Sequence, residues 1–205
     1  INSKILIECD FNNDDSINKS VEIIKKEWGS IDFLVHAVAF ADKTELNGRY
    51  IDTTKENFIN CLDISCYSLT NLAKAFEPIM NNGGSILTLT FYGSNKVIPN
   101  YNLMGIAKAA LETSVKYLSV DLGDKNIRVN AISAGPMRTI AGAAINNARQ
   151  VYKFTEKHSA LKRNAQLDEV GKSALYFVSD MSSAVTGEVH YVDCGYNIVG
   201  MPSEI

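Results

Sequence analysis

Ser-Ile-Leu-Thr-Leu-Thr, residues 85–90, is an apolar run of strand length that precedes a long helical pattern. That pattern spans Tyr101–Leu122, begins after Pro99 and closes at Gly123. Ile127–Ser133 (IRVNAIS) then supplies a second run of strand length. Two such runs joined by a helix are typical of a β-α-β unit, in which both strands lie parallel in one sheet.

The same alternation extends outward in both directions along the chain. Residues 81–84 (NNGG) read as a turn. The pattern predicts further strands at Lys4–Glu8, Phe33–Phe40 and Val189–Asp193, and further helices at Asp14–Trp28, Lys55–Met80 and Asp168–Val178. Strands alternating with helices indicate an α/β fold, with a Rossmann-type doubly wound parallel sheet and right-handed crossovers. We expect a single domain over residues 1–205.

Composition excludes several classes of function. The chain is 46% hydrophobic and 21% charged with a net charge of −3, so its composition gives no indication of nucleic-acid binding. No apolar run approaches the roughly 18 residues that a membrane span needs. The four cysteines show no CxxC spacing or Cys/His cluster, which argues against a metal site or a disulfide framework. These features favour a cytoplasmic protein with reduced thiols.

A sheet that binds a dinucleotide normally opens with a strand, a glycine-rich turn and a helix that meets the pyrophosphate. No such turn follows the first predicted strand, where Ile7–Phe11 leads into an Asn/Asp-rich loop. We expect the first two strands and helices of the fold to lie upstream of Ile1.

Tyr101 and Lys108 are the strongest candidates for chemistry. They are seven residues apart on one predicted helix, which places both side chains on one face and about 10 Å apart along the axis. A phenol can donate a hydrogen bond or a proton to a developing oxyanion. A nearby ammonium would favour the phenolate by its charge. Two such groups could serve different parts of one extended cofactor–substrate complex.

The stretch from Pro99 to Glu112, followed by Arg128–Thr139 (RVNAISAGPMRT), resembles the short-chain dehydrogenase/reductase superfamily. In detail it resembles the divergent branch of bacterial NADH-dependent enoyl-acyl-carrier-protein reductases. Ordinary members of the superfamily have Tyr-x3-Lys, whereas this branch has Tyr-x6-Lys, as Tyr101 and Lys108 do. Gly105 stands at the ordinary lysine position. The resemblance covers essentially the whole chain.

The resemblance implies a role for each matching residue. Tyr101 would bind the thioester carbonyl of the substrate, and Lys108 the nicotinamide ribose. Cofactor contacts are implied at Asp10, Phe11, His36, Ala37, Val38, Ala39, Ala134, Gly135, Pro136, Met137 and Thr139. Substrate contacts are implied at Phe91, Tyr92, Tyr101, Met104, Ile140, Ala141 and Ile145. Many relatives carry a tyrosine at Phe91, so this sequence disfavours a mechanism that needs two tyrosines.

Residues 139–155 resemble the mobile substrate-binding loop of these reductases, although they could also form a surface helix. Arg149 lies where relatives meet the acidic carrier protein. The resemblance implies reduction of a trans-2-enoyl thioester in fatty-acid synthesis, with NADH as cofactor, acyl carrier protein as partner and a homotetramer as the assembly. Two alternatives stay open: a carbonyl or β-ketoacyl reductase, and a dinucleotide-binding protein without turnover.

Overall fold

The computed structural model describes residues 3–139 and 148–201. Its described residues form one parallel sheet with the strand order β1-β2-β3-β4. The strands are β1 (Ile31–His36), β2 (Met80–Thr90), β3 (Arg128–Ala134) and β4 (Val189–Val192). The predicted α/β fold class with a parallel sheet is confirmed.

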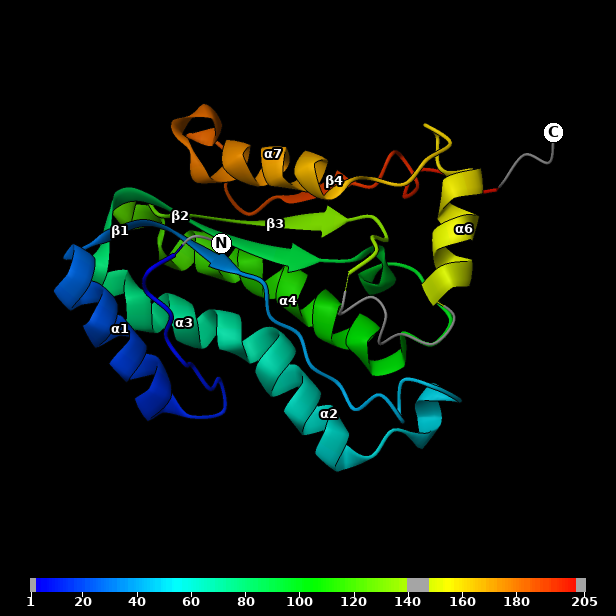
Figure 1. The fold of residues 1–205 in the computed structure, drawn as a ribbon, viewed down its shortest axis with the longest axis horizontal. Coiled ribbons are helices and arrows are strands. Elements are labelled where there is room, and N and C mark those ends of the chain that lie inside the picture. The colour runs from blue at the N-terminus through cyan, green and yellow to red at the C-terminus, as the bar shows by residue number, and fades with distance from the viewer. Residues whose placement is uncertain (1–2, 140–147, 202–205) are drawn as a thin grey trace.

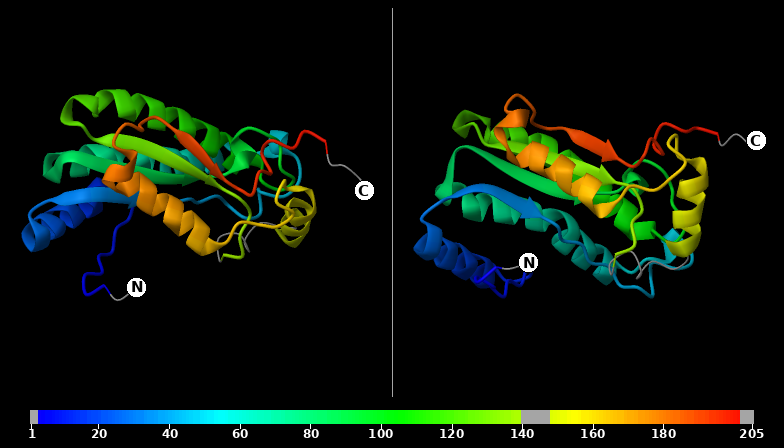
Figure 2. Two further views of the ribbon diagram at one scale, coloured as in Figure 1. Left: turned by 90° about the horizontal axis from the view of Figure 1, so that it is seen from above. Right: turned by 45° about the horizontal axis from the view of Figure 1, so that its top comes forward.

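Helices cover the two faces of the sheet (Figures 1 and 2). One face carries α3 and α4, with α1 beside α3, and the opposite face carries α7. Toward the carboxyl ends of the strands lies α6 (Figure 1). The helices are α1 (Asp14–Trp28), α2 (Lys55–Leu62), α3 (Ser68–Phe76), α4 (Asn102–Asp121), α6 (Ala148–His158) and α7 (Leu167–Val178).

Alternate side chains of the central strands fill two separate cores. Ile86 of β2 and Val129 of β3 pack against Leu111 and Val115 of α4. Their neighbours Leu87 and Ile132 point the other way and pack against Phe177 of α7 and the side chains around it. Successive side chains of a strand point to opposite faces, so a strand buried on both sides has an unbroken apolar sequence.

The three connections between strands all step in the same direction, from β1 to β4. The first two run over the face covered by α3 and α4, whereas the third runs over the face covered by α7. A connection that steps the same way on the opposite face has the opposite hand. The prediction of right-handed crossovers throughout is therefore wrong for the β3-α7-β4 unit. The position of α7 on this face is favoured because α7 buries the apolar side chains Leu87 and Ile132 there.

Several predicted elements differ from the structure. Lys4–Glu8 is not a strand, because no described strand pairs with it and Leu6 is 88% exposed. The strand predicted at Phe33–Phe40 is β1, which begins at Ile31 and ends at His36 because its ladder with β2 ends at the pair His36–Thr88.

The predicted helical stretch Lys55–Met80 is confirmed as helical from Lys55 to Ile79, but it is not a single α-helix. A π-helical turn, Asp63–Tyr67, separates α2 from α3, and a 3₁₀ turn with Pro78 ends the helical segment before β2. The predicted turn at 81–84 lies inside β2, which begins at Met80 with an irregular register against β1. The glycine Gly83 takes a φ of 85° there, which admits the irregularity.

The described ranges 3–139 and 148–201 contain no helix that is both long and apolar enough to cross a membrane. They also contain no group of three or more His, Cys, Asp or Glu side chains that could hold a metal ion. All four cysteines are free thiols.

Candidate active site

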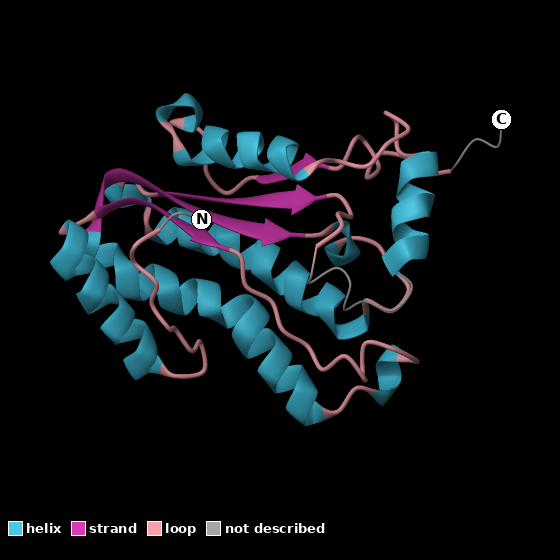
Figure 3. Ribbon diagram, in the orientation of Figure 1, coloured by secondary structure: helices cyan, strands magenta, loops and turns pink. Residues whose placement is uncertain are grey.

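The carboxyl ends of the four parallel strands meet at one end of the sheet (Figure 3). The segments that leave these ends are residues 37–40, 91–95, 135–139 and 193–197. Ligands of open α/β sheets bind at this end, outside the strands. The predicted cofactor and substrate residues after β1, β2 and β3 therefore share one end of the molecule.

Tyr101 lies at the N-terminus of α4, in a turn that asparagines allow. Asn100 and Asn102 flank it with φ values of 60° and 33°, a left-handed region that asparagine tolerates better than most residues. The Asn102 side chain donates to the Gly48 carbonyl at 3.3 Å. Tyr101 is only 6% exposed, and burial raises its phenol pKa. The phenol therefore stays protonated and can act as a hydrogen-bond donor.

Lys108 is buried on the same helix, two turns further along. Its ammonium donates to the Leu89 carbonyl of β2 at 2.9 Å. Burial lowers the Lys108 pKa to about 8, against the smaller opposing effects of Cys61, Cys66 and Glu112. Tyr101 and Lys108 are both 6% exposed, and both reach the end of β2, where the Tyr101 ring meets Phe91 and the Lys108 ammonium meets Leu89, as a shared face requires.

Gly105 explains why the lysine is not at the ordinary superfamily spacing. A Cβ at Gly105 would lie 2.7 Å from the Gly93 carbonyl oxygen, well inside van der Waals contact. A lysine four residues after Tyr101 would collide with the turn that follows β2. This backbone fits Tyr-x6-Lys and would have to shift to accept Tyr-x3-Lys, which argues further against the carbonyl-reductase alternative.

His36 is buried at the end of β1 and anchors the sheet to α3. Its Nδ1 lies 2.8 Å from the Thr88 hydroxyl, and its Nε2 lies 2.8 Å from the Ser68 hydroxyl. Burial, reinforced by the charge of Lys108, lowers the His36 pKa to about 4. The imidazole is therefore neutral at physiological pH and has both ring nitrogens engaged within the fold.

Ser65 holds the segment that follows His36. Its hydroxyl accepts from the Phe40 N–H at 2.8 Å and donates to the Phe40 carbonyl at 2.9 Å. Ser65 lies in the π-helical turn between α2 and α3 and is fully buried. The residues Ala37–Phe40, which include three predicted cofactor contacts, are thereby fixed without a neighbouring strand.

The structure brings some of the predicted substrate residues together. The rings of Phe91 and Tyr101 lie 5.0 Å apart in an edge-to-face contact, and Met104 belongs to the same buried cluster. Tyr92 lies elsewhere: its hydroxyl donates to the Asn197 carbonyl at 3.2 Å, and its ring packs against two C-terminal tyrosines. The remaining predictions, Ile140, Ala141 and Ile145, lie outside the described residues.

Of the predicted loop 139–155, residues 148–155 belong to helix α6 and residues 140–147 lie outside the described ranges. Arg149 is exposed in the first turn of α6. The surface-helix reading thus holds for the second half of this segment.

The segment after β3 is close-packed against β4. The Gly135 N–H donates to the Val192 carbonyl at 2.9 Å, and a Cβ at Gly135 would lie 3.0 Å from the Asp193 Cα. Only glycine admits this approach without displacement. The Met137 side chain packs into the core under α7, and the Thr139 N–H donates to the Met137 carbonyl at 3.0 Å.

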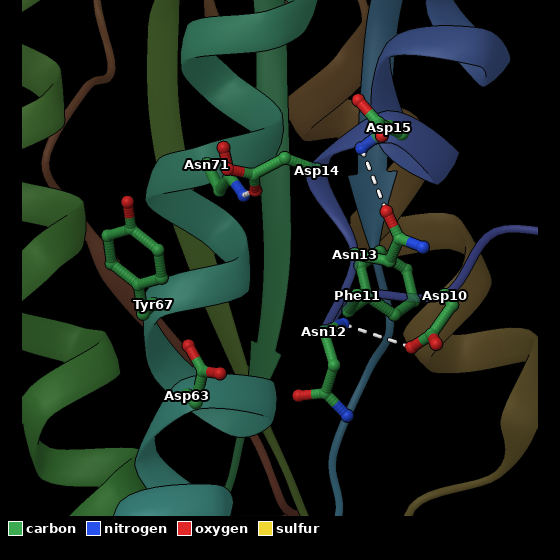
Figure 4. A pocket seen from close by; sticks show the side chains of 9 residues that line it. All are labelled: Asp10, Phe11, Asn12, Asn13, Asp14, Asp15, Asp63, Tyr67 and Asn71. Atoms are coloured by element: carbon green, nitrogen blue, oxygen red, sulfur yellow. Dashed lines mark hydrogen bonds between the residues drawn. The ribbon is translucent and has the colours of Figure 1, made fainter.

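Asp10 and Phe11 line a separate open cleft of about 550 Å³ (Figure 4). Asp10, Asn13 and Asp14 lie on one side of it, at the start of α1, and Asp63 and Tyr67 of the π-helical turn lie on the other. The Asp10 carboxylate accepts from the Asn12 N–H at 3.0 Å through one oxygen. Neither Tyr101 nor Lys108 lines this cleft, so the predicted residues fall into two groups.

The fold agrees with a comparison of the chain with known protein families. A family model described as Enoyl-(Acyl carrier protein) reductase matches residues 1–197. The chain belongs to this family. Its predicted class, an oxidoreductase of the short-chain type, is confirmed with it.

Individual members of the enoyl reductase family are closely similar. The chain is 56% identical to the NADH-dependent enoyl-[acyl-carrier-protein] reductase of Rickettsia felis, over 98% of this chain and 77% of that protein. It is 53% identical to enoyl-[acyl-carrier-protein] reductase [NADH] 2 of Rhizobium meliloti, over 99% and 76%. The solved Anaplasma phagocytophilum enoyl reductase, in complex with NAD, superimposes with a TM-score of 0.93 at 52% identity, over 98% of this chain and 75% of that one.

Sequence reasoning missed several residues of this enoyl reductase site. Ser65 and Ser68 were unremarkable serines in a predicted continuous helix, and no local signal marks the π-helical turn. Gly93 carried a usable signal, because a glycine between Tyr92 and Ser94 directly after a strand often marks a close approach. The same holds for Gly105, an isolated glycine inside a helical pattern.

Proposed function

We propose that this chain reduces the trans-2-enoyl thioester of acyl carrier protein to the saturated acyl thioester, with NADH as the reductant. One observation carries the proposal: Tyr101 at the N-cap of α4 and Lys108 on α4 are both buried and both reach the carboxyl end of β2. Relatives at 53–56% identity are named NADH-dependent enoyl-[acyl-carrier-protein] reductases.

The chemistry of the site suits a nicotinamide cofactor. Lys108 carries three donors, and among the described residues only the Leu89 carbonyl accepts from it, so two donors are left for ribose hydroxyls. Asp10 has a carboxylate oxygen available in its cleft for the amino group of an adenine. Ala37, Val38 and Ala39 offer small side chains on a segment held by Ser65, and Gly135 allows close backbone approach.

In the proposed mechanism, Lys108 would hold the nicotinamide ribose of NADH, and the cofactor would supply the hydride for the β-carbon of the enoyl thioester. Negative charge then develops on the thioester oxygen, and the Tyr101 phenol donates a hydrogen bond to it. Burial keeps Tyr101 protonated and removes competing water, which strengthens that bond. The resulting enolate then takes a proton from solvent at its α-carbon, which gives the saturated thioester. Lys108 binds and orients through its ammonium, and Phe91 and Met104 provide apolar surface beside the phenol.

The test is NADH oxidation with a crotonyl thioester, compared between the unaltered protein, Tyr101→Phe and Lys108→Met. We expect turnover by the unaltered protein, with kcat lowered in Tyr101→Phe by about 10- to 1,000-fold, as for loss of one oxyanion donor. In Lys108→Met we expect weaker NADH binding. Turnover of a ketone but not of the enoyl thioester would contradict the assignment.

We further propose that the enzyme is a homotetramer that works in the cytoplasm. Two sets of exposed apolar side chains support self-association. On α4 they are Ile106, Tyr117 and Val120, which are 42%, 74% and 78% exposed. On and after α7 they are Leu175 and Met181, which are 60% and 65% exposed. Two distinct faces are what a tetramer built from pairs of dimers requires.

A further inference from the structure

Gly93 lies against the ring of Tyr101. It sits in the 3₁₀ turn Tyr92–Ser94, directly after β2. A Cβ at Gly93 would lie 2.4 Å from the Tyr101 Cδ1 and 2.7 Å from its Cε1. Carbon atoms in contact are normally about 3.5–4.0 Å apart, so the ring occupies the space that any other side chain would need.

The ring has little room to give way. Phe91 meets it edge-to-face at 5.0 Å, and Tyr101 is buried in one cluster with Leu46, Cys61 and Met104. The turn itself is held close to α4, because Gly105 leaves space for the Gly93 carbonyl. Position 93 therefore determines how deep the phenol sits between the turn and the helix.

The backbone of Gly93 does not itself demand glycine. Its φ lies outside the left-handed region, where the structure places Gly29, Gly48, Gly83, Gly187 and Gly195. Besides the Tyr101 ring, the nearest atom a methyl group would meet is the Phe91 Cδ1 at 3.3 Å. An alanine here would thus change the position of one ring and leave the conformation of the chain acceptable.

We propose that Gly93 is a positioning residue, which sets the location of the Tyr101 hydroxyl relative to the thioester oxygen. The inference rests on the proposed function of Tyr101 and adds a determinant that acts through it. Gly93 itself contacts neither substrate nor cofactor in this scheme. Since a displacement of about 1 Å can cost about 100-fold in rate, a methyl group at this position is a large perturbation.

The experiment introduces Gly93→Ala into the unaltered enzyme and into Tyr101→Phe, which keeps the ring but lacks the hydroxyl. With NADH and a crotonyl thioester, kcat per NADH-binding site should fall about 10- to 100-fold in the first background. In Tyr101→Phe it should fall no further, while the drop in melting temperature is the same in both. Gly123→Ala, at a position with nothing within 4 Å, is the matched control and should keep full kcat.

An equal fold-loss of kcat in both backgrounds would overturn the proposal, because the effect would then not pass through the hydroxyl. Unchanged kcat in Gly93→Ala would overturn it as well. If Tyr101→Phe is too slow to compare, an unchanged Kd for NADH decides in favour of positioning, and a Kd weakened in parallel with kcat decides against it. Full activity of Tyr101→Phe alone would refute the role of the phenol, which is a separate result from the effect of Gly93.

Discussion

At the scale of single residues, burial shifts the pKa values of Tyr101 and Lys108 in opposite directions. Tyr101 keeps its proton because burial raises its pKa, whereas Lys108 loses its proton more easily because burial lowers its pKa. A phenol held neutral and an ammonium that is easily neutralised are suited to different tasks. The first donates a hydrogen bond to developing charge, and the second binds a polar ligand that favours its charged form.

The pKa of Lys108 predicts a pH dependence of cofactor binding. As pH rises through about 8, the free protein loses the ammonium, so the Kd for NADH should rise by up to about tenfold for each further pH unit. Fluorescence titration with NADH measures this, and Lys108→Met should bind weakly with no such dependence. An identical pH profile in that variant would assign the titration to another group.

Lys108 also makes the stability of the fold depend on pH. Rising pH weakens the binding of NADH but favours the folded state. Its pKa in the folded protein, about 8, lies below the ordinary value of 10.5. Between these two values the unfolded chain binds more protons than the folded one, so the contribution of Lys108 to stability rises with pH across that window. Burying the charged ammonium at neutral pH is thus a cost to the fold, which a bound ligand that accepts its hydrogen bonds would offset.

At the scale of elements, two glycines in helices should respond in opposite ways to alanine. Gly171 on α7 has nothing within 4 Å of its Cβ position, so Gly171→Ala should raise the free energy of unfolding by about 0.5–1 kcal/mol. Gly105→Ala should lower it, because the new Cβ would lie 2.7 Å from the Gly93 carbonyl. Urea unfolding of both variants measures the difference. A gain in stability for Gly105→Ala would show that the turn moves away at no cost.

Helices with clear end signals were predictable from sequence. Helix α1 matches the predicted Asp14–Trp28, because Asn13 caps it and Gly29 ends it. Helix α4 was predicted within one residue at each end from Pro99 before it and Gly123 after it, although no side-chain hydrogen bond caps its start. Strand ends depend instead on neighbouring strands, so Lys4–Glu8 and the far end of β1 could not be located from local sequence.

The residues of the candidate site also differ in how far local sequence could predict them. Tyr101 and Lys108 follow from helical spacing, which is a local property of the sequence. Contacts between segments distant in sequence do not, and the pairs Ser65–Phe40 and Gly93–Tyr101 depend on such contacts. The hydrogen bond from Tyr92 to the Asn197 carbonyl could not be predicted either, because the two residues are distant in sequence.

At the scale of the whole molecule, the exposed apolar face of α4 predicts that assembly can be disrupted there. The double variant Tyr117→Lys, Val120→Lys should form smaller species than the unaltered enzyme in sedimentation velocity, since it would place charges in a buried interface. Trp28→Lys on α1, where the side chain is 61% exposed, is the control and should leave the assembly unchanged. An unaltered tetramer in the double variant would exclude this face of α4 as an interface.

The hydroxyl of Ser65 does for one residue what a neighbouring strand does for many. It pairs with both the N–H and the carbonyl of Phe40, and Ser65 itself is fully buried. An alanine there would remove both hydrogen bonds, at about 0.5–1.5 kcal/mol each, and an ionised aspartate could accept but not donate. Serine and threonine are the small residues whose hydroxyl can both donate and accept a strong hydrogen bond. We therefore expect only these two small residues to preserve both contacts with Phe40 at this position.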